Sequence, residues 1–194
     1  MLEFIKNRKT IRKYRKRMVS LKVQSSVLEA GVWASSVHGF QPWRFVATTN
    51  RRTIKTVSNI LKKKADTIGK GINTLLRLTA TTIEGSPFIV FVYNTGTFTN
   101  IAYRFFKIDK KYAAVAKLTE TQAVAGAIQN MLLEAESLGL GSCWTATPIF
   151  SQKEINALLD EEGELLGILT FGYPAEEGKR SPRISPARSI RHIA

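Results

Sequence analysis

TQAVAGAIQNMLLEAESLGLGSCW, residues 121–144, is the stretch that decides the fold. In its first part apolar side chains recur every three or four residues, which is typical of a helix with a buried face. The recurring residues are Ala123, Ala127, Met131, Ala135 and Leu138, and Val124, Ile128 and Leu132 widen the apolar face beyond one side. The stretch predicts a central helix over residues 121–138, which a glycine of the following Leu-Gly-Leu-Gly ends in the left-handed conformation.

Three further stretches have the composition of strands. Residues 88–93, Phe-Ile-Val-Phe-Val-Tyr, form an uninterrupted apolar run, which is typical of a central strand buried on both faces. Residues 165–171 predict another strand, and residues 44–49, rich in Phe, Val and Thr, predict a third. Between them lie helical patterns without a strict strand-helix-strand rhythm, so the sequence favours an α+β fold.

The other helical patterns have recognisable starts. Ser20 is suited to cap a helix through about residue 34, whose expected buried stripe is Leu21, Leu28 and Val32. Residues 51–64 predict a basic amphipathic helix, with Ile54, Val57, Ile60 and Leu61 on its inner side. Residues 151–154, Ser-Gln-Lys-Glu, have the pattern of a capping box at the start of a short helix. The segment 94–117 stays unassigned.

Length and composition indicate one domain with an apolar core. The chain has 194 residues, of which 44% are hydrophobic, close to the average of globular proteins. We expect a single domain over residues 1–194, in which residues 175–194 form a C-terminal arm. No apolar run is long enough to span a bilayer, so no membrane segment is expected.

Cysteine and histidine are scarce. Cys143 is the one cysteine, and the two histidines are His38 and His192. A lone cysteine in an apolar setting indicates a buried side chain in a reducing compartment, and the N-terminus lacks the features of a secretory signal, so we expect a cytoplasmic protein. These residues offer no tetrahedral zinc site, and no metal is expected.

The charge is strongly basic and unevenly distributed. Lys and Arg outnumber Asp and Glu by 29 to 15, a net charge of +14, yet residues 120–178 hold ten acids and the single base Lys153. Eight basic residues fall within residues 1–20. Among them Arg15, Lys16 and Arg17 are expected to be solvated, and they could also attract the phosphates of a nicotinamide nucleotide from a distance. Base-stacking aromatics are absent from this segment apart from Tyr14, which disfavours nucleic acid and fits a phosphorylated small molecule.

No familiar catalytic motif is present in the sequence. The chain lacks a Gly-x-Ser-x-Gly elbow, a phosphate loop ending in Gly-Lys-Ser/Thr, and a Gly-x-Gly-x-x-Gly fingerprint after a strand. If the protein is an enzyme, we therefore expect a bound organic cofactor to carry the reaction.

Four short blocks bracket nearly the whole chain. They are residues 8–14 (Arg-Lys-Thr-Ile-Arg-Lys-Tyr), residues 34–45, which end in Gln-Pro-Trp-Arg-Phe, residues 129–144 with Leu-Gly-Leu-Gly-Ser-Cys-Trp, and residues 171–174 (Phe-Gly-Tyr-Pro). The first block has two guanidinium groups, an ammonium group and a hydroxyl that could surround a phosphate with charge-assisted hydrogen bonds. The second is a small polar loop that could bring backbone amides near a planar ligand.

In order and spacing, these blocks resemble those of the nitroreductase family of FMN-dependent oxidoreductases. That family begins with Arg-Arg-Ser-x-Arg-x-Tyr/Phe, continues with Asn-x-Gln-Pro-Trp and a helix ending in Leu-Gly-Leu-Gly, and finishes with Gly-Tyr-Pro and a basic arm. The resemblance implies an α+β fold with a central, mostly antiparallel sheet flanked by helices. It also implies an intertwined homodimer with FMN at the subunit interface.

The same resemblance implies which residues bind the cofactor. The residues that match those holding the FMN phosphate, ribityl chain and pyrimidine edge are Arg8, Lys9, Thr10 and Arg12. The partner chain's loop beside the flavin is matched by Ser35, Ser36, Val37, Gly39 and Gln41. The wall near the flavin N5 is matched by Trp144, Thr145 and Ala146, and the basic residue of the arm by Arg180 or Arg183.

The implied reaction is hydride transfer from NADH or NADPH, through flavin N5, to an electron-poor small molecule such as a nitroaromatic or quinone. It follows a ping-pong mechanism, in which no side chain need act as acid or base, so no catalytic residue is assigned. Two alternatives stay open. One is a protein of the same fold that binds flavin or nucleic acid without turnover, and the other is a flavoenzyme dedicated to one metabolite.

Overall fold

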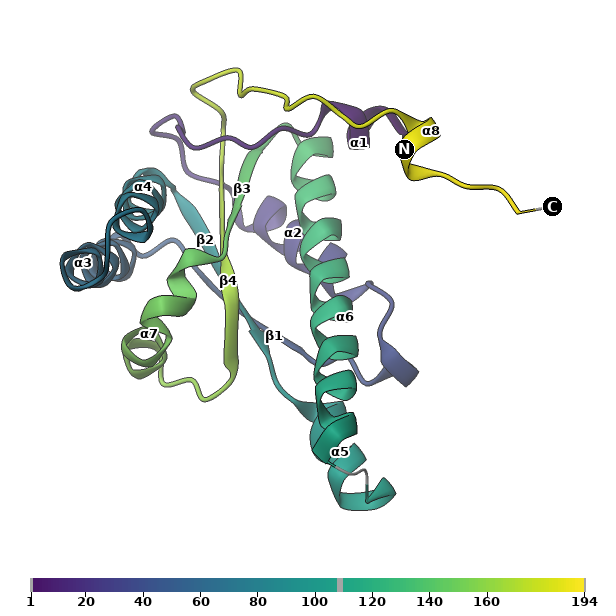
Figure 1. Ribbon diagram of the computed structural model, residues 1–194. Helices are drawn as coiled ribbons and strands as arrows, with labels where there is room; N and C mark the ends of the chain where they lie inside the picture. The colour runs from purple at the N-terminus through teal and green to yellow at the C-terminus, as the bar shows by residue number, and fades with distance from the viewer. Residues whose placement is uncertain (1, 108–109, 194) are drawn as a thin grey trace.

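A four-stranded antiparallel sheet forms the centre of the molecule (Figure 1). The computed structural model describes residues 2–107 and 110–193, so residues 108–109 of the unassigned segment and the last residue of the expected arm lie outside it. The strand order is β1-β2-β4-β3, and the strands are β1 (Trp43–Thr48), β2 (Phe88–Asn94), β3 (Gly141–Thr145) and β4 (Glu164–Gly172). The predicted α+β architecture with an antiparallel sheet is confirmed.

Strand β2 is buried on both faces, as its apolar run predicts. Every residue from 88 to 94 is buried. Phe88 and Val90 belong to the core on one face of the sheet, and Ile89 and Phe91 belong to the core on the other. The alternation follows from the two-residue repeat of a strand, because successive side chains point to opposite faces.

Helices cover both faces of the sheet, which gives three layers (Figure 1). One face carries α2 (Leu21–Val32) and the long helix α6 (Lys110–Ser137). The other carries α3 (Arg51–Thr67), α4 (Ile72–Gly85) and α7 (Gln152–Leu159). Each core is continuous, because the apolar stripe of every helix faces the sheet.

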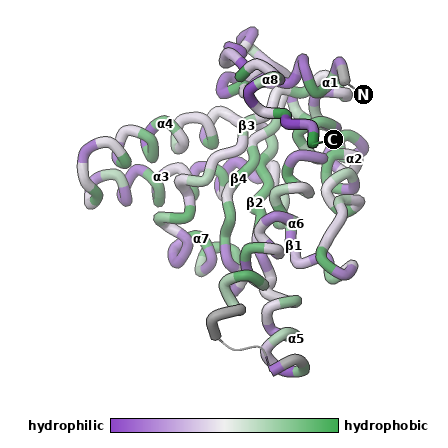
Figure 2. Tube along the Cα trace, turned by 45° about the vertical axis from the view of Figure 1, so that its right-hand side comes forward, coloured by the Kyte–Doolittle hydropathy of each residue, from purple (hydrophilic) through white to green (hydrophobic). Residues whose placement is uncertain are grey.

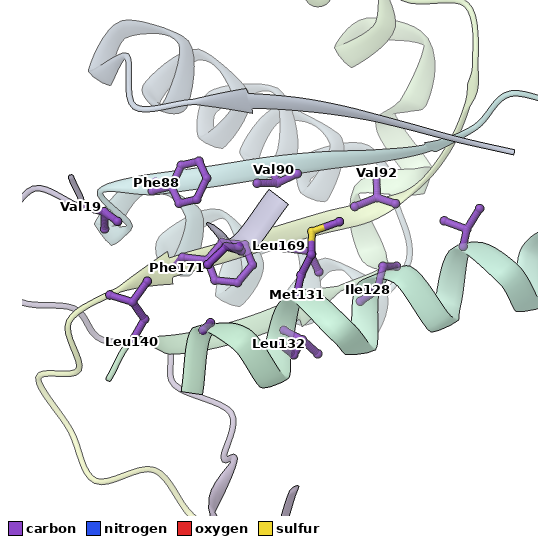
Figure 3. Packing of buried hydrophobic residues seen from close by; sticks show 13 residues of the cluster. Val19, Phe88, Val90, Val92, Ile128, Met131, Leu132, Leu140, Leu169 and Phe171 are labelled. Carbon is purple, nitrogen blue, oxygen red and sulfur yellow. The ribbon is translucent and has the colours of Figure 1, made fainter. Parts of the chain in front are cut away.

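The core under α6 explains why that helix decides the fold. Figure 3 shows Ile128, Met131 and Leu132 of α6 among side chains of the sheet, including Val90 of β2 and Leu169 of β4. All five are buried. Gly139, with a φ of 73°, follows the helix in the left-handed conformation, as predicted. The helix begins earlier than predicted, within the segment that the sequence left unassigned.

The remaining elements are short. They are α1 (Leu2–Asn7), the 3₁₀ turns η1 (Val37–Gly39) and η2 (Thr147–Ser151), α5 (Thr97–Phe106) and α8 (Pro186–Ser189). The unassigned segment therefore holds α5 and the first turns of α6. In Figure 2 strands β2 and β4 are largely hydrophobic, whereas the chain around α8 is largely hydrophilic. Within the described ranges, no helix has the length and apolar character needed to cross a bilayer.

The expected buried stripe of α2 is confirmed at Leu28, which packs against the core, and is wrong at Leu21 and Val32, which are exposed. Ser20 caps the helix, since its hydroxyl accepts from the amide of Val23 at 3.5 Å. However, the fully buried positions are Val27 and Gly31, whereas the side chain of Leu21 is 79% exposed. The physical reason is the close approach of α2 to α6: a Cβ at Gly31 would lie 2.4 Å from Cε of Met131, so this small residue faces inward.

The predicted capping box is also wrong in its hydrogen bonds, although α7 starts where it was expected. The hydroxyl of Ser151 is buried and has no hydrogen-bond partner. The turn η2 runs directly into α7, and the amide of Gln152 already donates to the carbonyl of Ile149. The preceding turn therefore supplies the backbone acceptors that a capping side chain would otherwise provide.

Candidate functional site

The N-terminal segment lies against the edge strand β3. Thr10 forms a parallel bridge with Ser142, and the amide of Ile11 donates to the carbonyl of Ser142 at 2.9 Å. Ile11 is buried, and a Cβ at Gly141 would lie 2.7 Å from its side chain. Gly141, the second glycine of the Leu-Gly-Leu-Gly block, therefore permits the N-terminal segment to lie close to β3, because it has no side chain.

A carboxylate from the start of the arm also fixes the N-terminal segment, directly after the residues that contact β3. The amides of Arg12 and Lys13 both donate to Oε1 of Glu176, at 2.7 and 3.2 Å. Further along, the amide of Arg15 donates to the carbonyl of Tyr173 at 2.8 Å. These bonds hold the backbone of the segment between β3 and the chain that follows β4.

The predicted cations of this segment have no carboxylate partner. Within residues 2–107 and 110–193, the side chains of Arg8, Lys9 and Arg12 form no ion pair. Arg8 and Lys9 are half-buried, and Arg12 is exposed. Burial raises the pKa of the nearby Cys143 thiol, whereas Arg12 and Arg8 oppose that shift. The guanidinium groups of Arg8 and Arg12 thus lie close enough to the buried start of β3 for their positive charge to lower the pKa of the Cys143 thiol.

The predicted wall residues follow on the same edge strand. Trp144 and Thr145 are the last residues of β3, and they pair with Leu169 and Ile168 of β4. The side chain of Trp144 is 43% exposed, so it is not a core residue. A Cβ at Gly167 would lie 3.0 Å from Nε1 of Trp144, which places the indole over that glycine. Trp144 therefore presents aromatic surface beside the edge of the sheet.

The predicted loop between α2 and β1 has an unusual backbone. His38, Gly39 and Gln41 all have positive φ values, of 46°, 72° and 48°. The hydroxyl of Ser36 accepts from the amide of Gln41 at 3.1 Å and holds the turn. Backbone strain of this kind costs free energy and is found where surrounding contacts maintain a binding conformation.

Aromatic contacts support that loop from α5. The ring of Phe98 lies with its centroid 5.5 Å from Phe40 and 5.9 Å from His38. The N-terminus of α5 is in turn held by Glu120 of α6, which is fully buried and accepts from the amides of Phe98 and Thr99 at 2.7 and 3.2 Å. The buried carboxylate thus fixes the helix against which the loop packs.

The structure brings the predicted residues together in two groups, not one. Lys9 lines a hollow of about 470 Å³ with Gly141 and Glu176, whereas Ser35, Ser36, Gly39 and Gln41 line another of about 510 Å³ beside α2. The two hollows share no residue. Figure 1 shows the turn near residue 38 and strand β3 on opposite sides of α6. Val37 belongs to the loop group, and Thr145 and Ala146 to the strand group.

The C-terminal arm runs back along α1 (Figure 1). A guanidinium nitrogen of Arg180 donates to the side-chain oxygen of Asn7 at 3.4 Å. This bond places Arg180 beside the start of residues 8–12, which we call the cation segment. Arg183 is exposed, and it makes no side-chain hydrogen bond to the residues that the structure describes. Of the two arginines that the sequence left in competition, Arg180 is thus the one beside the segment.

Two supporting residues were missed by the sequence analysis. Glu176 is the second residue after the Gly-Tyr-Pro block, and its contact with the backbone of residues 12–13 reveals its role. The role of Glu120 could have been predicted from the sequence, because this acid lies at helical spacing between Ala116 and Ala123, which are buried. An acid on the buried stripe of a helix requires polar partners, because an unpaired buried charge is costly.

Comparisons with known proteins identify the family of the chain. The model of the Nitroreductase family matches residues 5–173. A protein of Methanothermobacter thermautotrophicus, with the provisional name NADH dehydrogenase/NAD(P)H nitroreductase, is 26% identical over 192 residues, which cover 97% of this chain and 84% of that protein.

Solved structures share the fold. The FMN complex of a protein from Desulfovibrio desulfuricans, provisionally named a nitroreductase, has a TM-score of 0.74 at 24% identity and covers 100% of this chain and 96% of its own. A BluB-like flavoprotein from Clostridium difficile has a TM-score of 0.78 at 23% identity and covers 100% of this chain and 98% of its own.

Proposed function

Because the chain belongs to the nitroreductase family, we propose that it is an NAD(P)H-dependent oxidoreductase with FMN as its cofactor. The relative named above carries NAD(P)H nitroreductase in its name, and one structural neighbour is an FMN complex. The observation in this chain that supports the proposal is the set of cations at the edge of the sheet. Arg8, Lys9 and Arg12 are held on a fixed backbone and pair with no carboxylate among the residues that the structure describes.

The cation segment fits a phosphorylated flavin. A phosphate dianion is bound best by guanidinium groups, which donate two parallel hydrogen bonds, and Arg8 and Arg12 supply two of them. Lys9 and the hydroxyl of Thr10 add further donors beside the ribityl chain and the pyrimidine edge. Arg180 is the arm residue that we assign to the phosphate, because its contact with Asn7 places it beside this segment. Arg183 remains the second candidate.

The loop and the end of β3 fit the planar part of the cofactor. Residues 35–37 with Gly39 and Gln41 offer exposed backbone in a fixed conformation, which can approach a flat ring closely. Trp144, Thr145 and Ala146 form the wall where we expect a backbone amide to face N5. Fixed cations and amides at these places stabilise the negative charge that accompanies reduction.

We assign the two groups of residues to two different chains of a homodimer. One chain holds them in separate hollows, so a site that uses both requires a second copy. Large apolar side chains lie exposed on and beside α2, including Leu21 at 79% and Trp33 at 80%. Exposed apolar surface of this kind marks an interaction site. Residues 1–194 then act as one domain, with residues 175–194 as its arm.

The cofactor supplies the redox chemistry: when bound, FMN accepts a hydride from NADH or NADPH at N5 and passes two electrons to an electron-poor acceptor. In the ping-pong order that we propose, the oxidised nicotinamide leaves before a nitroaromatic or quinone-like molecule takes its place. The chain binds the cofactor, orients it and excludes water from it. No side chain is assigned as a proton donor or acceptor.

The test is the visible absorption of the purified protein. A protein with bound flavin is yellow, and the flavin band bleaches when NADH or NADPH is added without oxygen and returns when an acceptor is added. Initial rates at several fixed acceptor concentrations give parallel double-reciprocal lines for a ping-pong order. A protein that stays colourless after incubation with FMN, or a flavin band that NADH and NADPH leave unchanged, would contradict the proposal.

A further inference from the structure

A third hollow lies beside the N-terminal segment, where the chain turns towards α2. It has a volume of about 590 Å³ and is bounded by residues 14–18, the end of β1, the start of α3 and the end of α4. None of the residues predicted to bind FMN lines it. The volume falls within the range of about 300–1,000 Å³ that is usual for small-molecule sites.

Four cations line this hollow: Arg15, Lys16, Arg17 and Arg51. Among the residues that the structure describes, none of the four forms an ion pair, although cations elsewhere in the chain do. Their charge is therefore not cancelled by the protein itself. A concentration of uncompensated positive charge in a concave surface attracts anions, because the walls focus the field.

Neutral groups of the protein hold three of these cations in place. Nε of Arg15 donates to the carbonyl of Pro174 at 3.0 Å, and the guanidinium carbon of Arg17 lies 4.0 Å from the centroid of the Tyr173 ring. Arg51 donates through both terminal nitrogens to carbonyls at the end of α4, at 2.6 and 2.7 Å. Partners without charge fix a guanidinium group and leave its full charge for a ligand. The sequence-based expectation that Arg15 and Arg17 are merely solvated is incomplete.

The one carboxylate at the hollow is already engaged. Glu84 accepts from Nζ of Lys62 at 2.5 Å and from the hydroxyl of Ser58 at 2.8 Å. These bonds lower the pKa of Glu84, so it stays ionised and paired with Lys62 at neutral pH. The four lining cations thus meet no free anion in the hollow.

The walls also offer apolar surface. Tyr14, Met18 and Pro87 line the hollow together with the cations. The hydroxyl of Tyr14 is bonded inward, to the carbonyl of Ile11 at 2.6 Å and to the hydroxyl of Thr170 at 2.7 Å. A ligand that carries a phosphate beside a flat apolar group matches both kinds of surface.

We infer that this hollow is a second anion site, which binds a phosphate-bearing small molecule of nucleotide size. The cations at residues 15–17 and Arg51 bind the phosphate, and Tyr14, Met18 and Pro87 contact the apolar part. The site is separate from the flavin residues and does not depend on the proposed redox function. It gives a function to basic residues that binding of a single FMN leaves unused.

The experiment measures binding of AMP and of inorganic pyrophosphate by calorimetry, to protein saturated with FMN where flavin binds. Lys16→Glu is the test variant, because Lys16 makes no side-chain hydrogen bond or ion pair with the described residues and its loss should not affect folding. Lys63→Glu is the matched control, with the same change of charge at an exposed position of α3 outside the hollow.

We expect saturable binding of AMP, weaker binding of pyrophosphate, and a loss of about tenfold or more in affinity for both in Lys16→Glu, as for a lost charge-assisted contact. Lys63→Glu should stay within about twofold of the unchanged protein, since screening weakens the effect of a distant exposed charge. Absence of saturable binding, or equal affinities in the two variants, would overturn the inference. So would a protein that binds a single-stranded oligonucleotide but neither small molecule. Flavin content of both variants shows separately whether the FMN site is intact.

Discussion

The cation segment and the loop between α2 and β1 are both predicted to bind the same cofactor, yet they are built in different ways. Residues 8–12 lie in an extended conformation against β3, held by regular backbone bonds and by Glu176. Residues 35–41 leave the end of a helix through positive φ values and are held by Ser36 and an aromatic contact. Residues 8–12, the cation half of the proposed site, carry positive charge without positive φ values. Residues 35–41, the loop half, carry strained backbone without a fixed charge.

This difference indicates how the binding energy of the proposed FMN site is divided between residues 8–12 and residues 35–41. Charged groups bind a phosphate with little demand on the backbone, because a guanidinium group can reach its partner from many rotamers. A flat ring requires instead a backbone surface at close range, and strain is the cost of that surface. Each half is therefore suited to one part of FMN, and the two halves line separate hollows of the chain.

The largest expected effect comes from removing charge from the cation half. Arg8→Ala and Arg12→Ala should each weaken FMN binding by about 1.5–3 kcal/mol, because each removes a charge-assisted hydrogen bond. Fluorescence titration of the protein with FMN measures the affinity. Arg52→Ala, at an exposed position of α3, removes the same charge elsewhere and should leave the affinity unchanged. Unchanged FMN affinity in both test variants would refute the assignment of this half.

A smaller effect follows from disturbing the position of the cation half while its charges stay. A Cβ at Gly141 would lie 2.7 Å from the side chain of Ile11, so Gly141→Ala should displace residues 8–12, lower FMN occupancy and cost about 1–3 kcal/mol of stability. Gly126→Ala is the matched control, because nothing lies within 4 Å of its Cβ and a helical alanine should stabilise. Thermal unfolding and flavin content should separate the two; similar results would contradict the packing argument.

The loop half should be more tolerant of a methyl group. Gly39→Ala meets no neighbouring atom, but its φ of 72° disfavours any side chain, so we expect a loss of about 1 kcal/mol in stability and a modest fall in FMN affinity. Gly69→Ala, also in open space but without a positive φ, is the control and should be neutral. If Gly39→Ala lowered FMN affinity more than Arg8→Ala, the division of binding energy drawn above would be reversed.

The smallest effect is a pH dependence reported by Cys143, beside the cation half. Burial raises the pKa of this thiol, so the folded protein keeps the proton at a pH where the unfolded chain releases it. Stability should therefore fall as pH rises above about 8.5, the usual value in an unfolded chain, and Cys143→Ala should lose this part of the dependence. Arg12→Ala should raise the pKa of the thiol further, which slower alkylation at fixed pH would reveal. An unchanged rate would place Arg12 too far away to act.

Much of the fold could be predicted from the sequence because its decisive elements are buried. The run at residues 88–93 is fully buried, and the apolar stripe of residues 121–138 faces the core except at Leu138, which is exposed. Helix α4 was missed because threonines are frequent in it and Gly71 precedes it without a capping side chain. Strand β3 was missed because a five-residue edge strand has too few positions for a pattern.

The resemblance could assign candidate site residues but not their arrangement in the fold. The resemblance of four blocks assigned roles to Arg8 and Gln41, and in the structure Arg8 is half-buried and Gln41 is exposed. The sequence around Arg8 and around Gln41 does not show that α6 lies between them, because their separation follows from contacts between segments that are distant in the chain. Nor could it reveal Glu176, whose bonds to residues 12–13 cross almost the whole chain.

The central claim is that the cation half of one chain and the loop half of its partner form each FMN site. Two variants are to be co-expressed with different tags, Arg8→Ala with Arg12→Ala in one chain and Gly39→Val in the other, and the mixed dimer purified. Each variant alone should retain little FMN. The mixed dimer should bind one FMN tightly, because one of its sites combines two intact halves. A mixed dimer without flavin, or a single chain that binds FMN at full affinity, would contradict the claim.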